Sequence, residues 1–234
     1  MEARGVVIVI DVIRAFTVAA YAFAGGADRL WLVSTVDEAF ALREREPRAQ
    51  LAGEVGGRLI PGFDFNNSPS LMAAADVQGQ LLIQRTGAGT QGATRAVNAT
   101  HLLVCSLVNA QATALYARKL AIATGKLITL LPTFSGWEVN VASEDEICAD
   151  YLAALLGERE DAADILINGI AQLRTLGRFA QWEQGDQDFP FGDIEKILDA
   201  NRFDFALVGT HKQWNGIAYV EVERRDPTEL IDRH

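Results

Sequence analysis

The sequence predicts an α/β protein with a mostly parallel sheet and helices on both faces of that sheet. Residues 6–10 read Val-Val-Ile-Val-Ile, and such a continuous β-branched run is typical of a parallel strand buried on both faces. Strand-like and helix-like segments then alternate at least five times along the chain. Because parallel strands are joined by helical crossovers, this alternation favours α/β/α layers.

Further strands are expected wherever short apolar runs lie between turn residues. They cover residues 30–33, 50–52, 81–84, 102–105, 127–131, 205–208 and 217–222. The last two are separated by Asn215-Gly216, a pair typical of a tight hairpin turn.

Helices are expected where capping or stop residues flank an apolar pattern. Gly25-Gly26 ends an Ala-rich segment at 17–24, and Ser68-Pro69 supplies an N-cap followed by a first-turn proline. The other expected helices cover 35–45, 109–121 and 143–156, with a mainly helical stretch to about residue 201. The glycine-containing segments 55–67 and 86–92 are predicted to be loops.

Composition restricts the class of protein and its partners. The 234 residues are 49% hydrophobic, which suffices for one unit over 1–234 or for two closely joined lobes that meet near residue 135. A net charge of -10 argues against a nucleic-acid surface, and the apolar run at 6–10 is far shorter than the roughly 20 residues of a membrane span. Two cysteines do not indicate a disulfide framework. We therefore expect a cytoplasmic protein with neither nucleic-acid nor membrane partners. The expectation of a possible homodimer rests only on the general frequency of symmetric dimers.

Polar residues follow nearly every predicted strand, at the end where open α/β sheets bind ligands. In chain order they are Asp11 and Arg14, Gly53 and Glu54, residues 86–92, Ser106 and Asn109, and then Thr133, Ser135, Glu144 and Asp145. Because carboxyl ends of parallel strands lie at one edge of a sheet, these residues predict a shared site.

Asp11 and Glu54 are the candidate metal ligands. Mg²⁺ prefers oxygen ligands and usually takes one or two carboxylates, with water and substrate phosphate completing its shell. Asp11 could instead cap the next helix, and Glu54 could be a surface residue. Arg14 has the planar fork that suits phosphate, although a structural pairing with Asp11 would also explain it.

The segment Thr86-Gly87-Ala88-Gly89-Thr90 is a candidate anion-binding loop. Its glycines would let backbone amides approach an anion closely, but an ordinary glycine-rich turn explains the same pattern. Asp145 lies in a segment that fits a capping box between Ser143 and Glu146. An acidic residue at this position is thus explained equally well by the helix dipole and by a catalytic role.

Together these motifs resemble the 2-phosphosulfolactate phosphatase family. The matching segments, in order, are Ile10-Asp11-Val12-Ile13-Arg14-Ala15, Gly53-Glu54, Gly62-Phe63-Asp64-Phe65-Asn66-Asn67-Ser68-Pro69, Thr86 to Thr90, Asn109-Ala110 and Glu144-Asp145. The late segment from Asp193 to Asp204 also resembles the family's C-terminal part. The stretch from Gly62 to Pro69 is the most specific.

The resemblance implies a magnesium-dependent phosphoric monoester hydrolase. It converts (2R)-2-phospho-3-sulfolactate to sulfolactate and phosphate, a step of coenzyme M biosynthesis in some organisms. Our hypothesis takes Asp11 and Glu54 as metal ligands and catalytic residues, with Asp145 as a third catalytic residue. The expected substrate-binding residues are Arg14, Asn67, Thr86, Gly89, Thr90 and Asn109.

The chain departs from the family's pattern at three positions. Ala88 replaces a frequent asparagine, Val55 stands where an arginine is expected, and Asn66 replaces a usual glycine. The first two changes remove an amide and a guanidinium from the expected site. They leave open another phosphorylated acid as substrate, or a non-catalytic protein that binds a phosphorylated or sulfonated metabolite.

Overall fold

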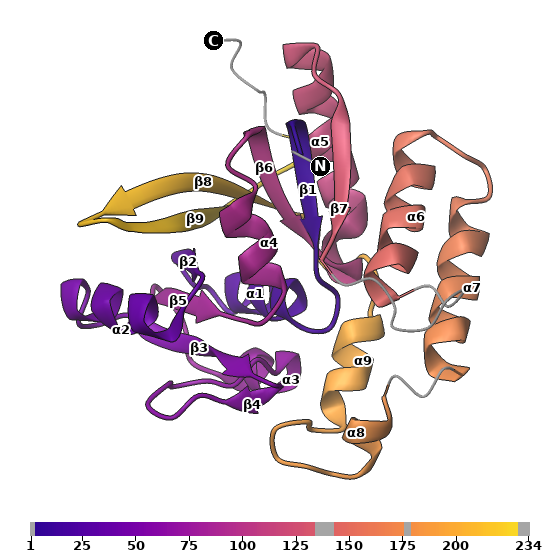
Figure 1. Cartoon of the computed structure of the whole chain (residues 1–234). Helices are drawn as coiled ribbons and strands as arrows, with labels where there is room; N and C mark the ends of the chain where they lie inside the picture. Colours follow the sequence, from indigo (N-terminus) through magenta and orange to yellow (C-terminus); the bar gives the residue numbers. More distant parts are fainter. Residues whose placement is uncertain (1–2, 134–142, 176–178, 229–234) are drawn as a thin grey trace.

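The computed structural model describes residues 3–133, 143–175 and 179–228, and within them nine strands form one sheet (Figure 1). The strand order across the sheet is β4-β3-β5-β2-β9-β8-β6-β1-β7. The strands are β1 (Gly5–Ile10), β2 (Arg29–Val33), β3 (Gln50–Val55), β4 (Arg58–Leu59), β5 (Leu81–Arg85), β6 (Ala99–Cys105), β7 (Ile128–Pro132), β8 (Ala206–Trp214) and β9 (Ile217–Arg225).

The sheet is mixed, so the prediction of a mostly parallel sheet is wrong. Two groups are parallel internally, β3-β5-β2 and β6-β1-β7, whereas the four pairings of β4 with β3, β2 with β9, β9 with β8 and β8 with β6 are antiparallel. The alternation of strands and helices correctly predicts each parallel group. It misses that the hairpin of β8 and β9 enters between the two groups.

The two parallel groups bring their carboxyl ends toward the middle of the molecule (Figure 1). In a flat sheet, the three antiparallel pairings between β2 and β6 would make the strands of one group run opposite to those of the other. Sheet twist counteracts this reversal, because adjacent strands rotate by roughly 20–25° and six steps separate β3 from β1. As a result, residues that follow β1 and β5 come into contact with one another.

Helices cover both faces of the sheet, as predicted. Val7 and Val9 of β1 pack into one core with α1, while Val6, Ile8 and Ile10 pack into another with α5 and α6. The helices are α1 (Ala15–Ala24), α2 (Val36–Arg45), α3 (Pro69–Ala74), α4 (Gly89–Arg95), α5 (Ala110–Thr124), α6 (Glu144–Leu156), α7 (Ala162–Thr175), α8 (Ala180–Glu183) and α9 (Gly192–Leu198). None of the helices described here has the length and apolarity needed to cross a membrane.

The cap predictions are confirmed, and the two loop predictions are wrong in part. The Ser68 hydroxyl accepts from the backbone N–H of Leu71 at 3.3 Å, and Ser143 forms a reciprocal capping box with Glu146. The predicted loop at 55–67 contains the short strand β4, and α4 begins inside the predicted loop at 86–92. The possible lobe boundary near residue 135 lies outside the described residues.

Candidate active site

Five of the predicted site residues line one pocket of about 300 Å³ at the carboxyl ends of β1, β3 and β5. They are Asp11, Arg14, Glu54, Asn67 and Thr86. A neighbouring pocket of about 440 Å³ shares Gly87 and Ala88 with it, but its described lining includes neither of the two predicted metal ligands. The smaller pocket is therefore the candidate site.

Asp11 combines a capping contact with a place in the pocket wall. It follows the fully buried strand β1 and is itself only 4% exposed. One of its oxygens, Oδ1, accepts from the backbone N–H of Ala15 at 2.9 Å, in the first turn of α1. Burial raises the pKa of Asp11 to about 7; the N–H of Ala15 opposes that rise, and the charges of Glu144 and Glu54 add to it. The Asp11 carboxylate is thus costly to keep charged in this pocket, mainly because it is buried.

Glu54 connects two loops through backbone amides. Gly53, with φ 150°, allows β3 to approach β5 so closely that a Cβ atom there would lie 1.9 Å from the carbonyl oxygen of Arg85. Glu54 follows this contact, and its Oε1 and Oε2 accept from the N–H groups of Gly87 and Gly57, each at 2.6 Å. Glu54 is half-buried and anchors the pocket rim, so the surface interpretation does not describe it.

Asp11 and Glu54 are the two carboxylates of the pocket that could hold a divalent cation. A carboxylate oxygen that accepts one N–H keeps further acceptor capacity, and Asp11 and Glu54 repel one another across the pocket. Within the described ranges, no group of three or more His, Cys, Asp or Glu side chains could hold a metal ion. A Mg²⁺ ion at this place would thus take two protein carboxylates and complete its shell with water and substrate oxygens.

Two threonines shape the loop that follows β5. The N–H of Thr86 donates to the Thr90 hydroxyl at 2.9 Å, and the N–H of Thr90 donates to the Thr86 hydroxyl at 3.1 Å. Thr86 lines the pocket, whereas Thr90 is fully buried beneath it. Gly89 lies against Asp11: a Cβ atom at this glycine would be 2.6 Å from Asp11 Oδ2.

Replacing Gly89 by alanine should therefore damage the site directly. The added methyl would meet both Asp11 and the Ala15 side chain, at 2.6 and 2.7 Å, so we expect a loss of about 1–3 kcal/mol in unfolding free energy. Chemical denaturation measures that loss. Gly157→Ala, whose methyl would lie 3.3 Å from its nearest neighbour, the carbonyl oxygen of Ala153, is the comparison and should lose clearly less stability than Gly89→Ala. Equal stability of the two variants would contradict the contact.

Asn67 is oriented by a buried glutamine. Gln84 lies within β5 and is 1% exposed; its amide donates to the carbonyl of Ala15 at 3.0 Å and to Asn67 Oδ1 at 3.3 Å. With its oxygen engaged in this way, Asn67 can offer its NH₂ group to a ligand in the pocket.

Asn109 and Asp145 are not among the described residues that line the pocket. Asn109 is fully buried, and its Oδ1 accepts from the backbone N–H of Ser106 at 3.1 Å. Asp145 Oδ1 accepts from the N–H of Val12 at 2.7 Å, and Oδ2 accepts from the Thr133 hydroxyl at 3.1 Å. Asp145 thereby fixes the backbone next to Asp11.

Comparison with known proteins identifies the family of the chain. The family described as 2-phosphosulpholactate phosphatase matches residues 1–182, which include every site residue predicted from the sequence. The chain belongs to the 2-phosphosulfolactate phosphatase family.

Three relatives are each described as a probable 2-phosphosulfolactate phosphatase. The protein of Bacillus subtilis is 44% identical over 149 residues, covering 64% of this chain and 63% of the relative. That of Carboxydothermus hydrogenoformans is 38% identical over 66% of this chain and 61% of its own length. That of Thermus thermophilus is 38% identical over 69% and 68%, respectively. The chain thus spans less than two thirds of the length of the first two relatives.

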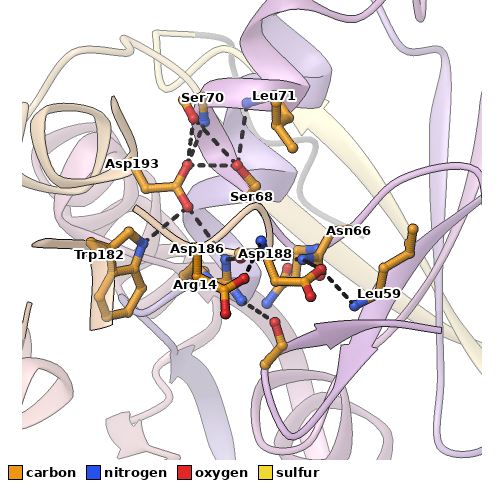
Figure 2. Close-up of polar contacts among 12 residues, drawn as sticks. Arg14, Leu59, Asn66, Ser68, Ser70, Leu71, Trp182, Asp186, Asp188 and Asp193 are labelled. Atoms are coloured by element: carbon orange, nitrogen blue, oxygen red, sulfur yellow. Dashed lines mark hydrogen bonds and ion pairs between the residues drawn. The ribbon is translucent and has the colours of Figure 1, made fainter. Parts of the chain in front are cut away.

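In this member of the 2-phosphosulfolactate phosphatase family, Arg14 is held from beyond the matched residues. The proposed pairing with Asp11 is not its contact. Its Nη1 donates to the Asp193 carboxylate at 3.3 Å and to the carbonyl of Asp188 at 2.7 Å, while Nη2 donates to the carbonyl of Gly57 at 2.8 Å (Figure 2). Burial lowers the pKa of Arg14, and the Asp193 charge opposes that shift. Arg14 therefore keeps its charge as one half of a buried ion pair with Asp193.

Sequence reasoning missed the aromatic wall of the pocket. Trp182 and Phe189 line it, and their ring centroids lie 5.6 and 4.7 Å from the Arg14 guanidinium carbon. These residues come from a stretch that was predicted to be mainly helical. The density of Asp, Gly and aromatic residues between 182 and 193 departs from an amphipathic helix and is the signal that could have revealed them.

Proposed function

We propose that the chain is a magnesium-dependent phosphatase of a small phosphorylated acid, with 2-phospho-3-sulfolactate as the leading substrate. The observation that carries this proposal is the meeting of Asp11 and Glu54, from opposite groups of the sheet, beside Arg14 in one pocket. The names of the family and of its relatives support the same reaction. Free, buried Cys105 and Cys148 fit a reducing cytoplasm, which we include in the proposal.

Each pocket residue has a distinct part in the proposed hydrolysis. Asp11 and Glu54 would hold Mg²⁺, which when bound supplies charge neutralisation for the phosphoryl group and a more acidic water. Arg14 and the Asn67 amide donate hydrogen bonds to phosphoryl oxygens, and Thr86 lies at the same wall. The water oxygen bonds to phosphorus as water gives up a proton, the bond from phosphorus to the ester oxygen breaks, and that oxygen takes up a proton to leave as the alcohol.

The remaining predicted residues support this machinery from outside the pocket. Asp145 fixes the N–H of Val12, Thr90 fixes the backbone of Thr86, and Asn109 fixes that of Ser106. Gly89 leaves room for the Asp11 carboxylate. These positions act on the geometry of the site, whereas the five predicted residues that line the pocket would contact a bound substrate or ion.

The test is phosphate release from a panel of phosphorylated acids that includes 2-phospho-3-sulfolactate. We expect release from at least one of them, with a drop of at least about 100-fold in EDTA and recovery on adding excess MgCl₂. Undiminished turnover in EDTA would remove the metal from the proposal. If folded protein that binds phosphate releases none from any ester, the assignment as a phosphatase is wrong.

A non-catalytic binding protein is the second candidate. Ala88 favours it, because this side chain lines the pocket and carries no polar group to meet a ligand. A thermal shift with phosphate esters and MgCl₂, combined with no phosphate release, would distinguish this candidate from the phosphatase.

A further inference from the structure

We propose that Asp193 is the positioning residue of the phosphate site, and that it acts by fixing the guanidinium of Arg14. The inference rests on the proposed function, since it assigns Arg14 to the phosphoryl group. It concerns a residue outside the matched range 1–182, on a helix that follows the rest of the pocket in the chain.

Asp193 collects donors from three parts of the fold (Figure 2). Its side chain is fully buried, at the beginning of α9. Oδ1 accepts from the hydroxyls of Ser68 and Ser70, each at 2.6 Å, and from the N–H of Ser70 at 3.0 Å. Oδ2 accepts from Arg14 Nη1 at 3.3 Å and from the indole N–H of Trp182 at 3.1 Å. A buried carboxylate is costly unless it is paired and hydrogen-bonded, and five donors meet that requirement here.

Each donor group belongs to the pocket or adjoins it. Arg14 and Trp182 line the pocket, and Ser68 directly follows Asn67, which also lines it. One carboxylate behind the pocket wall therefore sets the position of three wall segments.

The contacts of Arg14 leave a defined edge for a ligand. A guanidinium has five N–H donors. Both Nη1 hydrogens are directed to Asp193 and to the carbonyl of Asp188, and one Nη2 hydrogen is directed to the carbonyl of Gly57. Among the described residues, Nε and the second Nη2 hydrogen have no such partner and remain for an anion; a pair of donors on one guanidinium edge is the planar fork that suits a phosphate. The Phe189 and Trp182 rings restrict the tilt of the guanidinium plane.

The test is a double-mutant cycle with Asp193→Asn and Arg14→Lys. Asparagine keeps the shape and can still accept from Arg14, but it removes the charge; lysine keeps the charge and removes the fork. We expect Asp193→Asn to raise KM about tenfold, with kcat changing less than about threefold, and to weaken binding of inorganic phosphate with MgCl₂ by a similar factor in calorimetry. In the Arg14→Lys background, Asp193→Asn should add almost nothing to either quantity.

Additive effects of the two substitutions on KM and phosphate affinity would overturn the inference. If Asp193→Asn changes KM and phosphate affinity by the same factor with Arg14 and with Lys at position 14, Asp193 does not act through Arg14. Asp193→Glu, which restores the charge at a longer reach, should recover part of the phosphate affinity. Should Asp193→Asn fail to fold, Asp193→Glu takes its place in the cycle, with the same non-additivity expected. Calorimetry with phosphate also separates the two proposals, because it reports on Asp193 even if no ester is hydrolysed.

Asp64→Asn is the matched control for loss of a carboxylate. Asp64 also accepts from an arginine, Arg43 at 2.7 Å, and from a backbone N–H, that of Leu51 at 2.7 Å, but it is not among the described pocket residues. We expect this variant to be less stable than wild type with unchanged KM and phosphate affinity. A tenfold rise in KM from Asp64→Asn would show that KM follows general stability, and the inference would fail.

Discussion

Replacing Asp11 by asparagine should lower kcat/KM by about 10³-fold while the fold survives. The substitution keeps an oxygen for the N–H of Ala15 but removes the charge that would hold Mg²⁺. Loss of metal-assisted charge stabilisation is worth several kcal/mol, and about 4 kcal/mol corresponds to about 10³-fold. Phosphate release under saturating MgCl₂ measures the effect, and circular dichroism checks the fold. An Asp11→Asn protein with full activity would rule out Asp11 as a ligand.

The same substitution should change how stability depends on pH. Without metal, the folded-state pKa of Asp11 is about 7, above its usual value of 3.8, so the folded state holds a proton that the unfolded chain has already released. Wild-type stability must then fall as pH rises from about 4 to 7, by up to roughly 1.4 kcal/mol per pH unit. Relative to wild type, Asp11→Asn should gain about 3 kcal/mol between pH 5 and pH 8 in EDTA. A constant difference across that range would contradict the raised pKa.

Glu54→Gln should lower kcat/KM by about 10²–10³-fold, since it removes the second carboxylate from the cation site. Only one of the two amide positions of the glutamine can accept a hydrogen bond, so either the Gly57 N–H or the Gly87 N–H loses its acceptor. We therefore also expect a higher MgCl₂ requirement. Activity titrated against MgCl₂ measures both effects.

Glu38→Gln is the matched control for Glu54→Gln. Glu38 also accepts from two backbone N–H groups, those of Ser34 and Thr35, both through Oε2, at the beginning of α2 and outside the described pocket lining. Its replacement should leave kcat/KM and the MgCl₂ requirement at wild-type values. Equal losses in the two variants would mean that the effect of Glu54→Gln comes from loosened loops and not from the metal site.

Local sequence signals predict the parallel groups and five of the described pocket residues. The β-branched run at 6–10 predicts a doubly buried strand, which places Asp11 at its end because Asp11 directly follows. The Gly53-Glu54 pair likewise places a carboxylate where β3 approaches β5. Both arguments use only neighbours in the chain, and both agree with the structure.

Contacts between residues far apart in the chain could not be predicted from local sequence signals. Nothing within residues 205–222 tells which strands the hairpin of β8 and β9 will join, because that choice depends on which edges of β2 and β6 are open. The partner of Arg14 lies 179 residues away in the chain, so spacing suggested Asp11 in its place. Asn109 was predicted to contact substrate because it follows a strand, but its side chain closes its own turn.

The central place of β8 and β9 has a consequence for the order in which the protein can be completed during synthesis. Among the described strands, β3-β5-β2 and β6-β1-β7 have no ladder between them except through this hairpin. A nascent chain that still lacks residues 206–225 thus has no strand ladder between the group that is followed by Asp11 and the group that carries Glu54. We therefore expect the two carboxylates to take their final places in the pocket only after the hairpin has joined the two groups.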